Sequence, residues 1–115
     1  LRDGSGLSPR NGITPLQLAG ILQLATKDVA TFKSFYATLP IGGKSGTVKY
    51  LFKNSNVNGK IRLKSGSIER VRAYTGYAQR KDGQMLTFSL MVNNYTGSSS
   101  TLRRKLERFM EALCE

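Results

Sequence analysis

Residues 72–93, RAYTGYAQRKDGQMLTFSLMVN, decide the fold of this 115-residue chain. A run rich in aromatic and apolar residues stands on each side of Asp82-Gly83. An Asp-Gly pair between two such runs is a strong signal for a tight turn that joins antiparallel strands. We therefore predict a β-hairpin whose strands run roughly from Arg72 to Arg80 and from Met85 to Asn93.

A further strand is predicted just upstream of this hairpin. Asn58-Gly59 is a turn signal, and residues 61–64, Ile-Arg-Leu-Lys, then alternate between apolar and basic. This period of two is typical of a half-buried strand, which we expect to begin at Ile61. Residues 41–47 are predicted to form a loop. The apolar run at 48–52 fits a strand or a helix equally well, because a run this short has no diagnostic period.

Two helices are predicted before these strands. Thr14-Pro15-Leu16-Gln17 supplies a capping residue, a proline suited to the first helical position, and the glutamine of a capping box. Asp28 is predicted to cap a second helix that ends near Thr38, because Leu39-Pro40 follows it. The first helix is apolar around so much of its surface that we expect burial on more than one side. Its apolar residues are Leu16, Ala19, Ile21, Leu22, Leu24 and Ala25. The inner face of the second helix is predicted to hold Val29, Phe32, Phe35 and Tyr36.

The chain closes with a third predicted helix, after a polar connection from Tyr95 to Ser100. Its apolar residues recur at helical spacing, at Leu102, Leu106, Phe109, Met110 and Leu113. The order of helices, antiparallel strands and a final helix predicts an α+β fold, an antiparallel sheet backed by helices. A chain of this length fits one small domain with one core.

Composition narrows the possible functions. The chain has no histidine, which excludes Ser-His and Cys-His nucleophiles and argues against a zinc site. Its single cysteine, Cys114, cannot form an internal disulfide, and we expect it to be exposed near the frayed end of the chain. No apolar run approaches the ~18 residues that a membrane span needs. The net charge of +11 suits a solvated surface, nucleic acid, an anionic polymer or a carboxylate substrate.

Lys64-Ser65-Gly66 is the stretch whose residue types suggest chemistry. The lysine offers a positive charge, the serine a hydroxyl donor, and the glycine room for a ligand to approach the backbone. Ser67 would then present its backbone N–H from a strand edge. Together these groups suit an extended peptide that ends in a carboxylate, or a carbonyl that becomes an oxyanion. Taken alone, the motif is short, and a turn with an exposed lysine is its commoner explanation.

Four stretches together resemble the C-terminal part of the class C penicillin-binding proteins, which are D-alanyl-D-alanine carboxypeptidases/endopeptidases of bacterial cell-wall metabolism. They are DGSGLSPRN (Asp3–Asn11), GKIRLKSGSI (Gly59–Ile68), TGYAQRKDGQMLTFSLMVNNY (Thr75–Tyr95) and the closing helix. The resemblance covers essentially the whole chain. It implies that residues 1–115 are a single portion of a penicillin-binding/serine β-lactamase-like transpeptidase domain.

The resemblance also implies roles for individual residues. The family uses Ser-x-x-Lys, Ser-x-Asn and Lys-Thr-Gly motifs, and only the third has a counterpart here, with Ser65 in place of threonine. By this comparison Lys64 and Ser65 receive the terminal carboxylate of the substrate, and the Ser67 N–H is one oxyanion-hole donor. The substrate-binding residues that it implies are Gly66 and Ile68 on the strand and Asp3, Ser5 and Leu7 on the N-terminal loop.

No Ser-x-x-Lys occurs in the chain. We therefore expect it to be the C-terminal fragment of a longer serine enzyme that works through an acyl-enzyme, and to be inactive alone because the nucleophile and its base are absent. For the parent enzyme the resemblance implies peptidoglycan stem peptides and β-lactams as partners, no nucleic acid, no cofactor or metal, and a periplasmic or other extracytoplasmic location. We expect an exposed strand edge and apolar surface to favour a homo-oligomer of the fragment.

One alternative stays open. The chain could be a small basic module that binds nucleic acid or an anionic polymer through its strand face and terminal helix. Few aromatic residues interleave with its basic residues, and no known nucleic-acid motif is visible.

Overall fold

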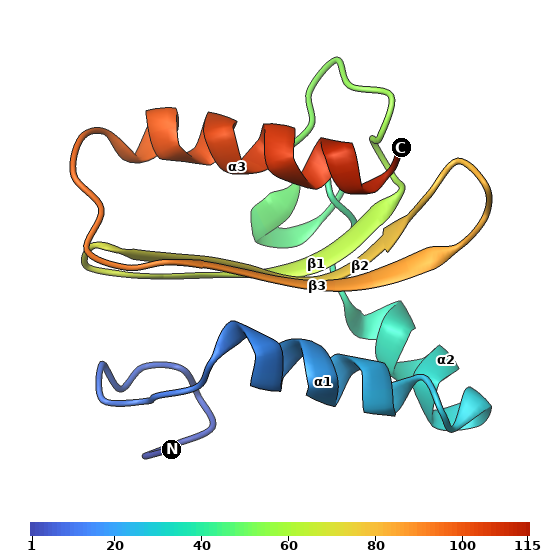
Figure 1. Cartoon of the computed structure of the whole chain (residues 1–115), viewed down its shortest axis with the longest axis horizontal. Coiled ribbons are helices and arrows are strands. Elements are labelled where there is room, and N and C mark those ends of the chain that lie inside the picture. Colours follow the sequence, from blue (N-terminus) through green and yellow to red (C-terminus); the bar gives the residue numbers. More distant parts are fainter.

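A central antiparallel sheet separates two layers of helices in the computed structural model, which describes residues 1–115. The chain forms α1 (Pro15–Ala25), α2 (Val29–Thr38), the short 3₁₀ helix η1 (Gly46–Val48), β1 (Ile61–Ile68), β2 (Val71–Gln79), β3 (Met85–Val92) and α3 (Ser99–Leu113). In Figure 1, α3 covers one face of the sheet, and α1 and α2 lie on the other. The α+β prediction is thus confirmed.

The strands lie in the order β1-β2-β3, so β1 is an edge strand. The predicted hairpin joins β2 to β3, and at its turn the Asp82 side chain accepts the Gln84 N–H at 2.9 Å. A second tight turn joins β1 to β2, with Ile68 paired to Val71 and Glu69 at a φ of 49°. Side chains in register across the three strands therefore form continuous rows.

A side-chain cap begins each α-helix, and for α1 and α2 it is the residue that the sequence predicts. Thr14 and Gln17 form the reciprocal capping box, with N–H···O distances of 3.0 and 2.9 Å. The Asp28 carboxylate accepts the Thr31 N–H at 3.2 Å at the start of α2. Ser98 does the same for α3, accepting from Thr101 at 3.2 Å. No helix of the chain is both long enough and apolar enough to cross a bilayer.

Residues 48–52, whose sequence fits a strand or a helix equally well, form neither of the two for most of their length. After η1 it continues as turns, with Phe52 at a φ of 59° although its side chain is buried. The Phe52 N–H donates to a carboxylate oxygen of Glu107 on α3 at 2.9 Å. This contact fixes the turns against the helix and satisfies an N–H that has no ladder partner.

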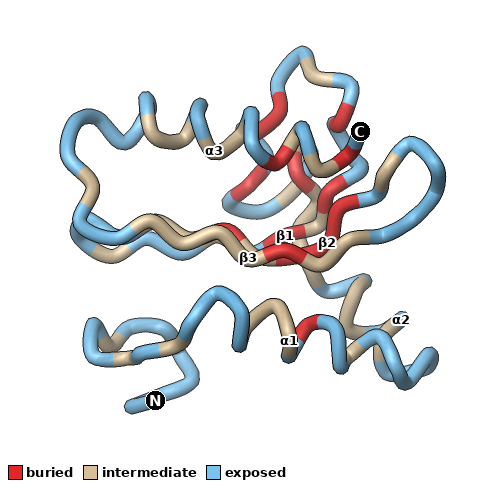
Figure 2. Tube along the Cα trace, viewed as in Figure 1, coloured by how far each residue is buried: buried red, intermediate tan, exposed pale blue.

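The core lies between the sheet and α3, as Figure 2 shows. Its buried residues come from the turns, the strands and α3: Val48, Leu51, Phe52, Val57, Ile61, Leu63, Tyr74, Ala78, Phe88, Met110 and Cys114. The expectation that Cys114 is exposed was wrong. Only 2% of its surface is accessible, because α3 ends with this side chain facing the sheet.

The expectation that α1 is buried on more than one side was also wrong. Only Leu22 is buried, whereas Leu16, Ile21 and Leu24 are 83%, 55% and 62% exposed. The sheet covers one side of α1, and no other element of this chain covers the opposite side (Figure 1). Val29, predicted on the inner face of α2, is 78% exposed for the same reason.

Candidate functional site

The Lys-Ser-Gly motif lies on β1, at the point where the outer edge of the sheet becomes open. Before the motif this edge is covered by the turn that follows α2. There Leu63 N–H donates to the Pro40 carbonyl at 3.0 Å, and Gly42 N–H donates to the Ile61 carbonyl at 2.8 Å. Both outward bonds come from alternate residues of β1. The cover ends at Leu63, immediately before Lys64.

Ser65 and Ser67 continue the same alternation. In an antiparallel pair, residues that bond the neighbouring strand alternate with residues whose backbone groups point away from it. Since Ile61 and Leu63 use their outward groups on the turn, Ser65 and Ser67 are the next two residues whose N–H and C=O point away from β2. The structure thus leaves the Ser67 N–H on an open edge.

Lys64 and Ser65 are held at this edge by short polar contacts. The Lys64 ammonium donates to the Ser65 carbonyl at 2.7 Å. The Ser65 hydroxyl lies 2.7 Å from the Thr47 hydroxyl, which belongs to η1. The ammonium and the hydroxyl therefore belong to neighbouring residues of one strand edge, and neither contact includes an acidic partner.

A cavity of ≈ 520 Å³ opens next to the motif, between the far end of the sheet and the N-terminal loop. Gly66 pairs with Ala73, which pairs with Met91, and this row of the sheet forms part of its wall. Gly66 and Ala73 have little or no side chain, so they leave the space of the cavity open. The sheet also contributes Ser67, Ile68, Glu69, Val71 and Asn93, and the loop contributes Gly6, Ser8, Pro9, Asn11, Gly12 and Ile13.

The N-terminal loop keeps its shape through hydrogen bonds to its own backbone. The Asp3 carboxylate accepts from the Asn11 amide at 2.8 Å and from the Gly6 N–H at 3.3 Å. The hydrogen bond from Asn11 is the main reason that the pKa of Asp3 lies below its usual value. Asn11 in turn accepts the Arg2 N–H at 2.7 Å. Asp3 thus closes the loop, as an Asx-type turn would.

The structure brings together part of the predicted set. Gly66, Ser67 and Ile68 line the cavity, whereas Lys64 and Ser65 lie beside it on the strand edge. The remaining three residues shape or flank the loop without lining the cavity. Asp3 bonds within the loop, Ser5 accepts the Leu7 N–H at 3.3 Å, and the Leu7 side chain is 83% exposed.

Sequence reasoning missed other residues at this site. Ala73 and Met91 line the cavity because the strand register places Ala73 opposite Gly66 and Met91 opposite Ala73, and the second of these pairings could have been derived from the Asp82-Gly83 turn. Asn11 gave no comparable signal, because its role depends on the folded loop. Thr47 is eighteen residues from Ser65, so only the path of the covering turn brings them together.

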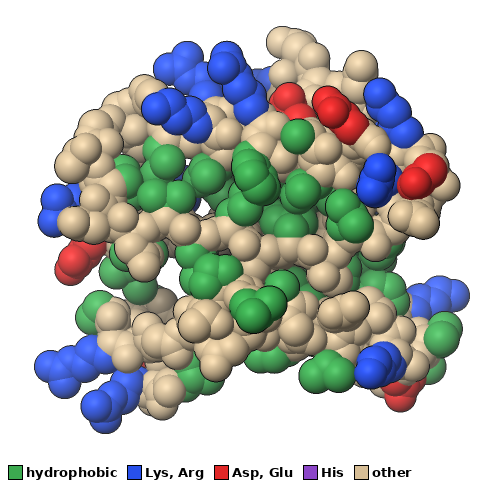
Figure 3. Space-filling model, viewed as in Figure 1, with side chains coloured by type: hydrophobic (Ala, Val, Ile, Leu, Met, Phe, Trp, Pro, Cys, Tyr) green, Lys and Arg blue, Asp and Glu red, His purple; other side chains and the backbone are tan.

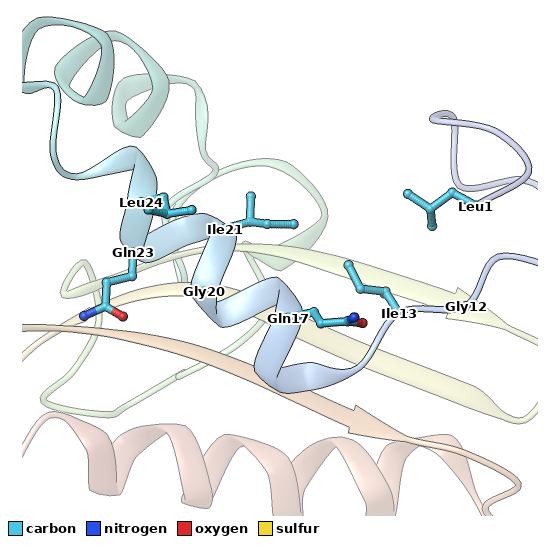
Figure 4. A pocket seen from close by; sticks show the side chains of 8 residues that line it. All are labelled: Leu1, Gly12, Ile13, Gln17, Gly20, Ile21, Gln23 and Leu24. Carbon is cyan, nitrogen blue, oxygen red and sulfur yellow. The ribbon is translucent and has the colours of Figure 1, made fainter.

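A larger hollow, of ≈ 650 Å³, lies on the outer side of α1 and offers no charged side chain or hydroxyl (Figure 4). It is lined by Leu1, Gly12, Ile13, Gln17, Gly20, Ile21, Gln23 and Leu24. In Figure 3 the basic side chains form separate groups rather than one continuous field. The lysine, the hydroxyl and the open backbone N–H of the candidate site all belong to β1.

Comparisons with known proteins identify the family of the chain. Residues 1–113 match the model of the D-Ala-D-Ala carboxypeptidase 3 (S13) family. The chain is 32% identical over 99 residues to carboxypeptidase DacB of Mycolicibacterium smegmatis, and 34% identical over 98 residues to penicillin-sensitive carboxypeptidase A of Dictyostelium discoideum. These matches cover 82% and 80% of this chain but 22% and 19% of the relatives, so the chain spans about a fifth of their length.

A solved structure has the same fold. Penicillin-binding protein 4 (DacB) of Haemophilus influenzae, crystallised with a β-lactam, superposes with a TM-score of 0.80 at 28% identity. The match covers 96% of this chain and 27% of that one. Together these findings confirm the family that the four sequence stretches resemble, and they confirm the expected fold.

Proposed function

The chain belongs to the D-Ala-D-Ala carboxypeptidase 3 (S13) family, and from this premise we propose that its open β1 edge binds the D-alanyl-D-alanine end of a peptidoglycan stem peptide. The observation that carries the proposal is that the turn after α2 covers only the first part of the outer edge of β1. The cover stops at Leu63, and the next outward backbone groups belong to Ser65 and Ser67. An extended peptide can therefore add to the sheet beside the motif.

In this proposal Lys64 and Ser65 receive the terminal carboxylate. The Lys64 ammonium is held at the edge by the Ser65 carbonyl, and the Ser65 hydroxyl belongs to the next residue of the strand. A hydrogen bond to a carboxylate is stronger when the donor is charged, so the ammonium supplies most of the attraction and the hydroxyl supplies direction. The serine retains the hydroxyl of the threonine usual in the family and lacks only its methyl group.

The Ser67 N–H is proposed as one donor of an oxyanion hole. A fixed backbone N–H stabilises the negative charge that develops on the carbonyl oxygen during acyl transfer. Gly66 keeps the backbone approachable, because it has no Cβ. The cavity beyond it would hold the residue before the scissile bond, with Ile68 on the strand side and Leu7, Asp3 and Ser5 on or behind the loop.

The reaction proposed is serine acyl transfer: the serine of a Ser-x-x-Lys motif attacks the carbonyl of the scissile bond, the residue after that bond leaves as the amine, and water then hydrolyses the acyl-enzyme ester. That motif is absent from these 115 residues. The serine and its base would therefore come from residues outside this chain, and residues 1–115 would act as the C-terminal part of the domain and would not acylate alone. A β-lactam would occupy the same edge in the complete, extracytoplasmic enzyme, which could act as carboxypeptidase or endopeptidase.

The proposal is tested by titrating the ¹⁵N-labelled chain with N-acetyl-D-alanyl-D-alanine and with its methyl ester. We expect the free acid to shift the amide signals of residues 65–68, with a weaker effect of the ester because it lacks the carboxylate. Lys64→Met should weaken binding of the acid by about three- to tenfold. Lys27→Met, which removes the same charge from an exposed site, should leave it unchanged.

Equal binding of acid and ester, or equal effects of the two lysine variants, would contradict the proposal. Shifts confined to α3 would instead favour a general polyanion site, and the signal changes would then follow net charge and salt. Labelling by a fluorescent penicillin separates binding from chemistry. We expect none on residues 1–115 and labelling once a segment with Ser-x-x-Lys is present.

A further inference from the structure

The covering turn is the segment of residues 40–48 that follows α2 and lies along the edge of β1. Thr47 makes its one hydrogen bond to the Ser65 side chain. Its hydroxyl oxygen lies 2.7 Å from the Ser65 hydroxyl oxygen. The two residues are on separate elements, η1 and β1. No other hydrogen bond joins the Ser65 side chain to the protein. The direction of the Ser65 hydroxyl therefore depends on Thr47.

The position of Thr47 is itself fixed by the fold. The turn closes on itself, with Ile41 N–H donating to the Ser45 hydroxyl at 2.8 Å and Gly43 N–H donating to the Val48 carbonyl at 3.0 Å. Val48, the residue after Thr47, is fully buried in the core. Thr47 thus stands on an anchored support, although its own side chain is exposed.

The two hydroxyls have one proton each, so their hydrogen bond has a direction. If Ser65 donates to Thr47, the Ser65 proton is used and cannot meet a carboxylate. If Thr47 donates to Ser65, the Ser65 proton is free to point at a ligand. A bound carboxylate accepts hydrogen bonds only, so it selects the second arrangement and forms a chain from Thr47 through Ser65 to the ligand. Each bond in such a chain polarises the next.

We propose that Thr47 is a positioning residue, which orients the Ser65 hydroxyl so that it donates to the terminal carboxylate of the bound peptide. Thr47 does not touch the ligand and acts through Ser65. The inference rests on the proposed function, since it assigns to Ser65 the same carboxylate. It adds that the covering turn is part of the binding site and not only a cap on the strand.

The test compares Thr47→Val with Thr47→Ser in the 115-residue chain, again with N-acetyl-D-alanyl-D-alanine and its methyl ester. Valine has the shape of threonine without the hydroxyl, and the site is exposed, so folding should be unaffected. We expect Thr47→Val to weaken binding of the acid by about fivefold and to leave the ester unchanged, since one hydrogen bond is lost. Thr47→Ser should restore binding to within about twofold.

A double-mutant cycle asks whether Thr47 acts through Ser65. In a Ser65→Ala background, Thr47→Val should have no further effect on binding of the acid. Three-bond couplings that report the χ1 angle of Ser65 give a readout that needs no ligand. They should show one dominant rotamer with Thr47 or Ser at this position and an averaged one with Val.

The outcomes separate the inference from the proposed function. If the unchanged chain prefers the acid and Thr47→Val binds it equally well, the role of Thr47 is overturned and the proposed function stands. If Thr47→Val weakens acid and ester alike, Thr47 is only a support for the strand and the inference is again overturned. If the unchanged chain shows no preference for the acid, the proposed function fails, and the role assigned to Thr47 fails with it.

Discussion

Cys114 is a residue whose place in the sequence misleads. One residue from the C-terminus, it suggested an exposed thiol, yet it closes the core between α3 and the sheet. Burial in these apolar surroundings disfavours the thiolate and raises the pKa of Cys114, although the charge of Lys60 acts in the opposite direction. The thiol is thus an apolar packing group here, and we expect it to react slowly.

The raised pKa gives this chain an alkaline limit to its stability. Below the pKa of the unfolded chain's thiol, both states hold the proton and Cys114 adds no pH dependence. Above it the unfolded state loses the proton first, so the free energy of unfolding falls as pH rises toward the folded pKa. We predict that this fall begins near about pH 8.5, the ordinary pKa of a cysteine thiol, and we would measure it by urea denaturation at fixed ionic strength.

Cys114→Ala is the matched variant. It should be less stable at neutral pH, because it leaves a small cavity, but its stability should change less above about pH 8.5. The pKa of Tyr77 is also raised by burial, so its own contribution to the alkaline fall begins only near about pH 10, the ordinary pKa of tyrosine. An equal alkaline slope in both proteins would show that the thiol is not the cause.

At the scale of elements, Gly76 and Gly66 of the sheet differ in what an added side chain would meet. A Cβ on Gly76 of β2 would run into the Arg62 carbonyl and would lie 2.7 Å from the Leu63 Cα. A Cβ on Gly66 of β1 would meet only the Ala73 Cβ, at 3.9 Å. The first glycine therefore allows β1 and β2 to approach, and the second is free to serve the site.

We predict that Gly76→Ala destabilises the chain by about 2–3 kcal/mol or prevents folding, because two backbones must separate. Gly66→Ala should change stability by less than about 0.5 kcal/mol but weaken peptide binding. Thermal unfolding of both, together with the ¹⁵N titration, checks this contrast. Equal stability of the two variants would mean that the β1–β2 contact can relax around a methyl group.

The elements themselves were largely predictable from local signals. Both hairpin strands, the strand at Ile61 and the starts of α1 and α2 follow from alternation, turn pairs and caps, and each is present at the expected place. The third helix is also present, but it begins at Ser99, inside the connection that was predicted to reach Ser100. Residues 48–52 could not be assigned, because their turns depend on Glu107, more than fifty residues away. Local pattern fails where a distant side chain decides the backbone.

At the scale of the whole molecule, burial was the least predictable property. The apolar residues of α1 predicted a helix that is covered on more than one side. The sequence pattern of a helix shows which of its faces are apolar, but not which part of the protein packs against them. In Figure 4, Ile21 and Leu24 point away from the sheet, into the hollow on the outer side of α1. An exposed apolar surface of this kind favours association.

We predict that a second copy of this chain covers that surface in concentrated solution. Sedimentation velocity should show a concentration-dependent dimer, which raised salt strengthens because it screens the repulsion between chains of charge +11. Leu24→Glu should abolish the dimer. Val29→Glu, which changes an even more exposed apolar side chain on α2, should not. A single monomeric species at high concentration would contradict the prediction.

The candidate site was predictable in its chemistry but not in its architecture. Lys64, Ser65, Gly66 and Ser67 stood out by residue type, and their place on an edge strand is the one that a peptide site requires. The loop residue Asn11 and the turn residue Thr47 could not be foreseen, because folding alone brings Asn11 to the cavity and Thr47 to the strand.

The turn that covers the start of β1 also limits how far a bound peptide can extend along the strand. A peptide that adds to the open edge can extend freely past Ile68, where nothing continues the strand pairing, but in the other direction it meets the turn that occupies the edge at Leu63. If its carboxylate lies at Ser65, there is no room for another residue beyond it. The molecule would then distinguish a chain end from a chain interior by the space left on its edge, before any side chain is recognised.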